Sequence, residues 1–390
     1  MGKAQAVADR GNGSASGQLG DVVAEGERIM TICNACRYCE GFCAVFPAME
    51  RRLTFAEADL NYLANLCHNC TECLYACQYE PPHPFAINVP RTLAQIRVRS
   101  YEKYSWPSQL GLLYRRAGIS LVLCVMCLLL AAMIAATAAL SPHGLRSSDG
   151  TANFYAVVPH WVLAYTFGAV FLFDVIALLM AVRRYLSDTS VAIVGTPSGG
   201  LLEGLRDALS LRYLHGTDED CATKENSRTP WRRWFHHCTL YGFLLCFAAT
   251  SVATVYHTFF DYPAPYPWLS LPVILGTLGG IGLIVGPIGL AMSRQRQDPE
   301  TLDAAQQRPD YAFIFLLVLT SGTGLMLLAG RSSTAMGALL MVHLAAVMTL
   351  FLTLPYGKFV HGLYRTAALV QYARESRAGT PASGADAAAG

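Results

Sequence analysis

The sequence predicts a mainly α-helical protein in which a small cysteine-rich N-terminal domain precedes a bundle of six transmembrane helices. Composition is the first observation behind this fold class. The 390 residues are 53% hydrophobic and only 14% charged, whereas soluble domains carry about 25% charged residues. The deficit lies in long charge-poor runs after residue 116. The second observation is that most of the 13 cysteines are concentrated before residue 78.

Four segments are expected along the chain. Residues 1–26 are rich in Gly, Ser and Ala and lack the hydrophobic region of a signal peptide, so a disordered N-terminus is expected. Residues 27–100 form the cysteine-rich domain, in which a capping box at Thr54 and Glu57 opens a helix. Residues 101–375 form the membrane domain, and residues 376–390 are a low-complexity tail that we expect to be disordered.

Six charge-poor segments are each close to the ~20 residues that cross a bilayer. They are expected at residues 117–140, 160–182, 237–259, 269–292, 311–330 and 336–357. Arginine and lysine are abundant in the connections on one side, whereas the other side holds only Arg146 and Arg331. This asymmetry predicts that the cysteine-rich domain and both termini are cytoplasmic. The formal net charge of +2 gives no indication of nucleic-acid binding, and no nucleic acid is expected as a partner.

Two cysteine runs share the spacing C-x2-C-x2-C-x3-C. In two-cluster ferredoxins, the fourth cysteine of each run ligates the other cluster. The expected ligands are Cys33, Cys36, Cys39 and Cys77 for the first [4Fe–4S] cluster, and Cys67, Cys70, Cys73 and Cys43 for the second. Zinc sites usually come as C-x2-C pairs, and disulfides are rare in the cytoplasm, so both are weaker interpretations. His68 lies inside the second run and is expected to be a solvent-facing loop residue.

Histidines occur near both the inner and the outer ends of the third and sixth predicted spans. His236 or His237 is expected level with His361 at the inner end, and His257 level with His343 at the outer end. Such pairs are typical axial ligands of b-type haem, and one or two haems are predicted. His343 and His361 are 18 residues apart, or about five turns of one helix, and helical phase favours His236 over His237.

Three further features of the membrane domain have two interpretations each. Asp174 is either a proton relay for a quinone or a carboxylate bonded to a neighbouring helix. His160 is a spare haem ligand or, more simply, an interfacial histidine. Residues 201–214 form an amphipathic helix on the membrane surface or under the cysteine-rich domain. The glycines of residues 269–292 are interpreted as helix-packing residues.

The chain resembles the TcuB/CitB family, the tricarballylate or citrate utilisation protein B. The resemblance rests on the two cysteine runs and on the segments WRRWFHHCTLYGFLLCFAATSVATVYH and MVHLAAVMTLFLTLPYGKFVH, and it covers about residues 27–375. The second segment also resembles the haem-bearing helix of the respiratory nitrate reductase gamma subunit. That likeness supports His343 and His361 as ligands.

The resemblance implies an electron-transfer protein of the bacterial inner membrane. Such proteins reoxidise the reduced flavin of a cytoplasmic FAD-dependent tricarballylate dehydrogenase and pass electrons through the clusters and haem to the quinone pool. Two alternatives stay open. One is a subunit that oxidises quinol and feeds a soluble reductase. The other is a zinc-binding or redox-sensing membrane module.

Overall fold

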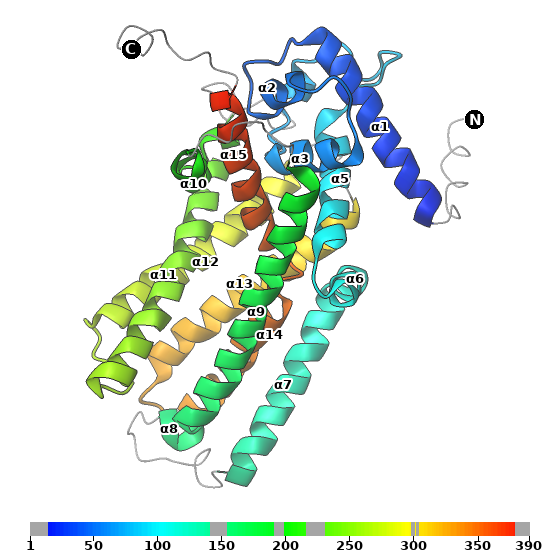
Figure 1. Cartoon of the computed structure of the whole chain (residues 1–390). Helices are drawn as coiled ribbons and strands as arrows, with labels where there is room; N and C mark the ends of the chain where they lie inside the picture. Colours follow the sequence, from blue (N-terminus) through cyan, green and yellow to red (C-terminus); the bar gives the residue numbers. More distant parts are fainter. Residues whose placement is uncertain are drawn as a thin grey trace, which may run out of the picture.

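Helices dominate the part of the chain that the computed structural model describes, and no β-strand occurs in that part. The described residues are 15–140, 154–190, 199–215, 231–297, 301 and 304–378. Figure 1 shows a group of short helices at one end of a bundle of long ones. The predicted fold class, mainly α-helical with a cysteine-rich domain before a helical bundle, is therefore confirmed.

The cysteine-rich domain contains five helices. They are α1 (Ala15–Cys36), α2 (Val45–Glu50), α3 (Glu57–Leu66), α4 (Glu72–Tyr75) and α5 (Val89–Tyr104). Helix α1 begins inside the stretch predicted to be disordered, which corrects that boundary. Within that stretch, Val22 and Val23 pack against the domain core, which stabilises the helix. The predicted capping box is also wrong: α3 is capped at Ala56, whose N–H donates to Asp59 Oδ2 at 3.2 Å.

Among the described residues, six helices are long and apolar enough to cross a membrane. They are α7 (Ile119–Leu140), α9 (His160–Thr189), α11 (Trp231–Phe260), α12 (Leu271–Gln295), α13 (Ala304–Gly330) and α14 (Met336–Thr353). Their number agrees with the six predicted spans. Helices α9 and α11 each have 30 residues and continue beyond the predicted spans toward the cysteine-rich domain. The short helices α6 (Ser108–Ala117) and α8 (Phe154–Val157) lie at opposite ends of the bundle (Figure 1).

The sixth predicted span forms a single helix, but His361, expected just past its inner end, lies on a second helix. Helix α14 ends at Thr353, a turn containing Pro355 follows, and α15 (Val360–Ala378) begins after it. Proline has no N–H to donate and clashes with the preceding helical turn, which favours the break at this position. The argument that His343 and His361 lie five turns apart on one helix is therefore wrong.

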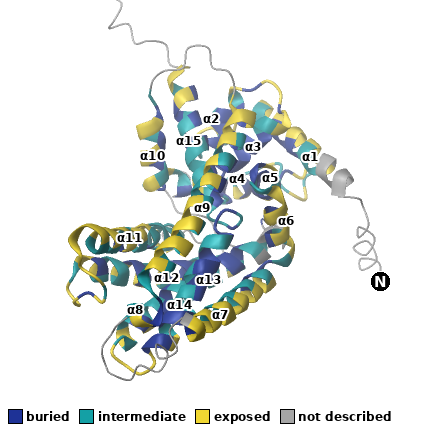
Figure 2. Cartoon of the chain, turned by 60° about the horizontal axis from the view of Figure 1, so that its bottom comes forward, coloured by how far each residue is buried: buried dark blue, intermediate teal, exposed yellow. Residues whose placement is uncertain are grey.

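Helix α15 shares a core with the cysteine-rich domain. The rings of Tyr185 of α9 and Tyr364 of α15 stack at 5.1 Å, and Tyr104 of α5 meets Tyr185 edge-on at 5.4 Å. Arg52 also donates to Glu375 of α15 at 2.9 Å in a buried ion pair. Figure 2 shows this junction as a buried region between helices whose outer faces are exposed. The domain is thus fixed to the bundle by α9 and α15.

Helices α11 and α12 pack with their backbones in close contact. A Cβ atom at Gly279 would meet the backbone nitrogen of Cys246 and the carbonyl oxygen of Gly242, each at 2.8 Å. Residues without side chains are therefore required at this crossing. The interpretation of the glycines as packing residues is confirmed here.

The amphipathic segment forms α10 (Leu201–Leu209) and a short 3₁₀ helix, Arg212–His215. Helix α10 packs against α15, where a Cβ at Gly204 would meet the backbone of Val370 at 2.7 Å. Leu201 and Leu202 stay exposed, at 57% and 81%. The apolar face therefore points away from the cysteine-rich domain.

Candidate functional site

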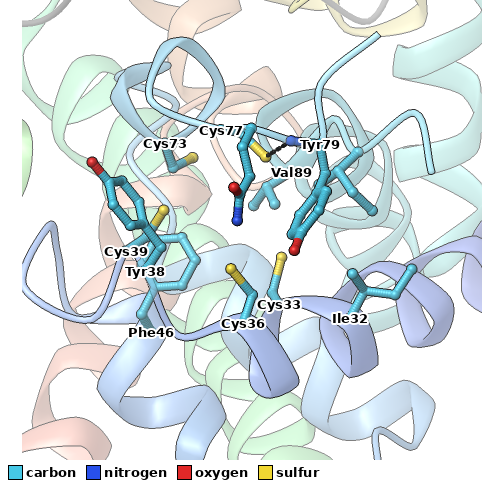
Figure 3. A pocket seen from close by; sticks show the side chains of 12 residues that line it. Ile32, Cys33, Cys36, Tyr38, Cys39, Phe46, Cys73, Cys77, Tyr79 and Val89 are labelled. Atoms are coloured by element: carbon cyan, nitrogen blue, oxygen red, sulfur yellow. Dashed lines mark hydrogen bonds between the residues drawn. The ribbon is translucent and has the colours of Figure 1, made fainter. Parts of the chain in front are cut away.

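Five cysteines surround a cavity of about 450 Å³, which we call cavity one. Cys33 and Cys36 lie on the last turn of α1, Cys39 follows in a turn, and Cys77 comes after α4. In Figure 3 their sulfur atoms lie around one central space, with Cys73 at its side. The four cysteines predicted to bind the first cluster therefore line one cavity.

A second cavity of about 400 Å³, cavity two, lies beside the first. It is lined by Cys43, Cys67, Cys70 and Cys73, and Cys73 also lines cavity one. Cys43 of the first run reaches cavity two, whereas Cys73 and Cys77 of the second run both line cavity one. Apart from Cys73, which lines both cavities, the cysteines are grouped as the crossed spacing suggests, and their assignment as cluster ligands stays a prediction.

The thiols have the chemistry of a cluster site. Burial and the neighbouring thiols raise the pKa of Cys33 and Cys39 to about 12. Burial likewise raises the pKa of Cys43 and Cys73 well above the ordinary value. Such thiols ionise when a metal replaces their protons, and soft thiolate ligands favour iron–sulfur clusters. In the described part of the chain, no three His, Cys, Asp or Glu side chains converge on a single metal ion.

Backbone N–H groups point at two of these sulfur atoms. The N–H of Tyr79 donates to Cys77 Sγ at 3.4 Å, the contact drawn in Figure 3. The N–H of Asn69 donates to Cys67 Sγ at the same distance, 3.4 Å. Hydrogen bonds to the ligating sulfurs raise the reduction potential of iron–sulfur clusters. Each cavity therefore has at least one such contact.

Two arginines attach the loop of cavity two to the bundle. Arg232 of α11 donates to the carbonyl oxygens of Asn69 at 2.8 Å and His68 at 3.0 Å. Arg365 of α15 donates to the carbonyl oxygen of Cys67. Neither arginine was identified from the sequence. Their spacing could have identified them, because each arginine lies four residues, or about one turn, from a candidate haem histidine on the same helix.

His236 of α11 and His361 of α15 lie close together, with ring centroids 6.0 Å apart and ring planes at 66°. A metal–imidazole bond is about 2 Å long, so two axial rings on one iron have centroids about 6 Å apart. The Nδ1 atom of His361 is hydrogen-bonded to the carbonyl oxygen of Lys358, which leaves Nε2 for a metal, a common arrangement for ligating histidines. The pair therefore fits one haem iron. His237 instead stacks on Tyr241 at 5.9 Å.

The predicted pairing of His257 with His343 is wrong. His257 stacks on His160 at 3.7 Å, and His343 Nδ1 lies 3.1 Å from Thr323 Oγ1. A Cβ at Gly324 would meet the ring of His343 at 2.9 Å, so this ring lies directly on α13. Helix α11 packs chiefly on α12 and α14 chiefly on α13, which separates the two histidines.

His68 is buried rather than solvent-facing, with 6% of its surface exposed. It lines cavity two, and its ring lies 6.3 Å from that of Tyr213. Its Nδ1 atom has no hydrogen-bond partner among the described residues. The prediction failed because the loop is covered by α11 and by the segment after α10, which the sequence did not place there.

Asp174 is 3% exposed, and neither carboxylate oxygen has a hydrogen-bond partner in the described structure. The interpretation of a carboxylate bonded to a neighbouring helix is therefore wrong. Burial raises the pKa of Tyr356 to about 12, and the Asp174 carboxylate adds to that rise. Asp174 consequently lies near the turn between α14 and α15.

Comparison with known proteins gives two family matches. The family described as citrate utilization protein B matches residues 111–382, and its Fer4-like domain matches residues 26–103. The citrate utilization protein B of Escherichia coli is 50% identical over 364 residues, which is 92% of this chain and 94% of that protein. No solved structure matches. The Fer4-like match covers both cavities, and the larger match covers the six long helices.

Proposed function

This chain belongs to the citrate utilization protein B family, and we propose that it conducts electrons from a reduced flavin to a membrane quinone. The conduit consists of two [4Fe–4S] clusters and one b-type haem. One observation carries this proposal: the thiol-lined cavities share Cys73, and the helices that hold cavity two also carry His236 and His361.

The sites form a series from the protein surface to the bundle. Tyr38 lines cavity one and is 66% exposed, so a soluble protein can approach this cavity. Cavity two lies behind cavity one and is lined by the buried His68. Arg232 bonds the backbone of His68 and lies one turn from His236. Electrons entering at cavity one thus reach the histidine pair through adjoining sites.

When bound, iron–sulfur clusters and haem accept and release one electron at a time. The chain's own residues set the conditions for that transfer. The cysteines exclude water and hold two clusters close together, and the N–H groups of Asn69 and Tyr79 stabilise negative charge at the sulfurs. Arg232 and Arg365 fix the second cluster relative to the histidines.

The partner we propose is a cytoplasmic FAD-dependent dehydrogenase that oxidises a tricarboxylate. The first substrate to test is tricarballylate. A matched relative is named for citrate utilization, which supports this class of substrate. The bacterial inner membrane is the proposed location, with the cysteine-rich domain and both termini in the cytoplasm. The six apolar helices and the excess of basic residues at the cysteine-rich end support this placement.

The experiment is an anaerobic visible spectrum of the purified chain with iron, sulfide and haem analysis. Two clusters and one haem give about eight sulfides and nine irons per chain. The dehydrogenase, its substrate and a short-tailed quinone are then added in turn. Reduction of clusters and haem by the dehydrogenase, followed by reoxidation by the quinone, is expected. A colourless, zinc-loaded protein would overturn the proposal.

A further inference from the structure

A third cavity lies next to the histidine pair and has no part in the sites described above. It lies between the end of α5, helix α6, the start of α13 and the turn after α14, and holds about 460 Å³ of space that is partly open to solvent. We call it cavity three, and its polar lining includes Tyr101, Asp310 and Lys358.

One polar group of cavity three lacks a partner. The hydroxyl of Tyr101 is buried and has no hydrogen-bond partner among the described residues. Burial raises the pKa of Tyr101 to about 12, so the phenol is protonated and able to donate at neutral pH. A buried donor without a partner costs free energy unless a ligand accepts its hydrogen bond. This group therefore points to an oxygen-bearing ligand.

The lining also carries a partly buried ion pair. Lys358 Nζ lies 3.0 Å from Asp310 Oδ2, and Arg294 also pairs with this carboxylate. Lys358 has further N–H bonds to donate, because an ammonium group has three donors. The cavity thus has donors on two different elements, with the apolar Val98 also in its lining.

Cavity three is adjacent both to the conduit and to the surface of the bundle. The carbonyl oxygen of Lys358, which lines it, is bonded to Nδ1 of His361. Helix α6 contributes Gly111 and Tyr114 to the lining and exposes Leu110, Leu112 and Leu113 at 40–48%. Figure 1 shows α6 at the end of α7 and crossing it. An apolar molecule can therefore approach from the lipid along α6.

We propose that cavity three binds the head group of a quinone, with Tyr101 and Lys358 donating to its two carbonyl oxygens. The inference rests on the proposed function, which supplies the reductant. Two electrons from the reduced flavin arrive one at a time through the conduit, and two protons come from water at this end of the bundle. The two quinone C=O groups become C–OH groups, and quinol leaves along α6.

The test uses the full chain in lipid nanodiscs and a photoreactive azido-quinone. Labelling is expected within residues 98–115, 309–310 or 356–358, and excess unlabelled quinone is expected to prevent it. Tyr101→Phe is expected to raise the half-saturating quinone concentration about tenfold, because one hydrogen bond is lost. Val98→Trp, which fills the cavity, is expected to abolish saturation. Tyr165→Phe, a change at a side chain 76% exposed on α9, is the matched control.

Cluster and haem contents are measured in every variant, so that misfolding is recognised. Labelling at another place, labelling that unlabelled quinone does not displace, or normal half-saturation in both variants would overturn the inference. A different result would contradict the proposed function. If the wild-type clusters and haem are reduced but no quinone reoxidises them, the conduit to quinone is wrong. Displaceable labelling of cavity three would still support the binding site.

Discussion

The side chain of Arg365 donates a hydrogen bond to the backbone carbonyl oxygen of Cys67. This contact joins α15, which carries His361, to the loop that lines cavity two. Arg232 makes the equivalent connection from α11, which carries His236. Both histidines of the candidate haem site are thus held at a fixed distance from the same four thiols.

Replacing Arg365 with Gln should slow electron transfer between the second cluster and the haem without removing either. A buried carbonyl without its charged donor costs about 1–3 kcal/mol, and the loop is then free to move. We expect about a tenfold fall in the rate of haem reduction, measured by stopped flow with the flavin partner. Arg374→Gln on the exposed side of α15 is the control. An unchanged rate in Arg365→Gln would show that the contact is only structural.

The grouping of the cysteines around two cavities could be predicted because their spacing is a local property. Cys33 and Cys36 lie one turn apart on α1, and Cys77 and Cys43 reach the cavities of the opposite runs because the two loops are compact. The histidine levels were predicted only in part. The rings of His236 and His361 do lie close together, but His361 is on α15, which the turn at Pro355 separates from the predicted sixth span.

The neighbours of the outer histidines, His257 and His343, could not be predicted from the sequence. Which helix lies beside which depends on packing across the whole bundle. The glycines of α12 bring it against α11, and His257 then meets His160 rather than His343. The burial of His68 has the same origin, since the covering residues come from α11 and from Tyr213.

Changing Cys36 to Ser should remove the first cluster and leave the second less stable. Cys36 lines cavity one only, whereas Cys73 lines both cavities. We expect iron and acid-labile sulfide to fall by about half relative to the wild type. Cys127→Ser on the exposed face of α7 is the control. Wild-type iron and sulfide contents in Cys36→Ser would disprove the assignment.

Replacing Gly279 with Leu should separate α11 from α12. The new side chain would clash with backbone atoms of Cys246 and Gly242, each 2.8 Å from its Cβ. Overpacking of this kind costs about 1–3 kcal/mol, so we expect a lower midpoint of thermal unfolding in detergent. Gly168→Leu is the matched control, because no atom lies within 4 Å of a Cβ there. Equal midpoints for the two variants would contradict the packing.

The orientation in the membrane can be tested with reporter fusions. The excess of arginine at the cysteine-rich end predicts that Gly200 and the C-terminus are cytoplasmic and that Ser332 is periplasmic. A phosphatase reporter, which is active only in the periplasm, should therefore be active at Ser332 and inactive at Gly200. Activity at Gly200 would invert the proposed topology.

The candidate haem site can be tested by comparing His361 with His343, because the two histidines have different neighbours. His361 lies close to His236, with ring centroids 6.0 Å apart, whereas His343 lies against Thr323 of α13. His361→Ala should leave one axial ligand and remove the haem. The flavin partner should then still bleach the clusters, but quinone reduction should stop. His343→Ala, the matched control, should keep the haem absorption band. Haem loss in His343→Ala together with a normal band in His361→Ala would move the site to the outer level of the bundle.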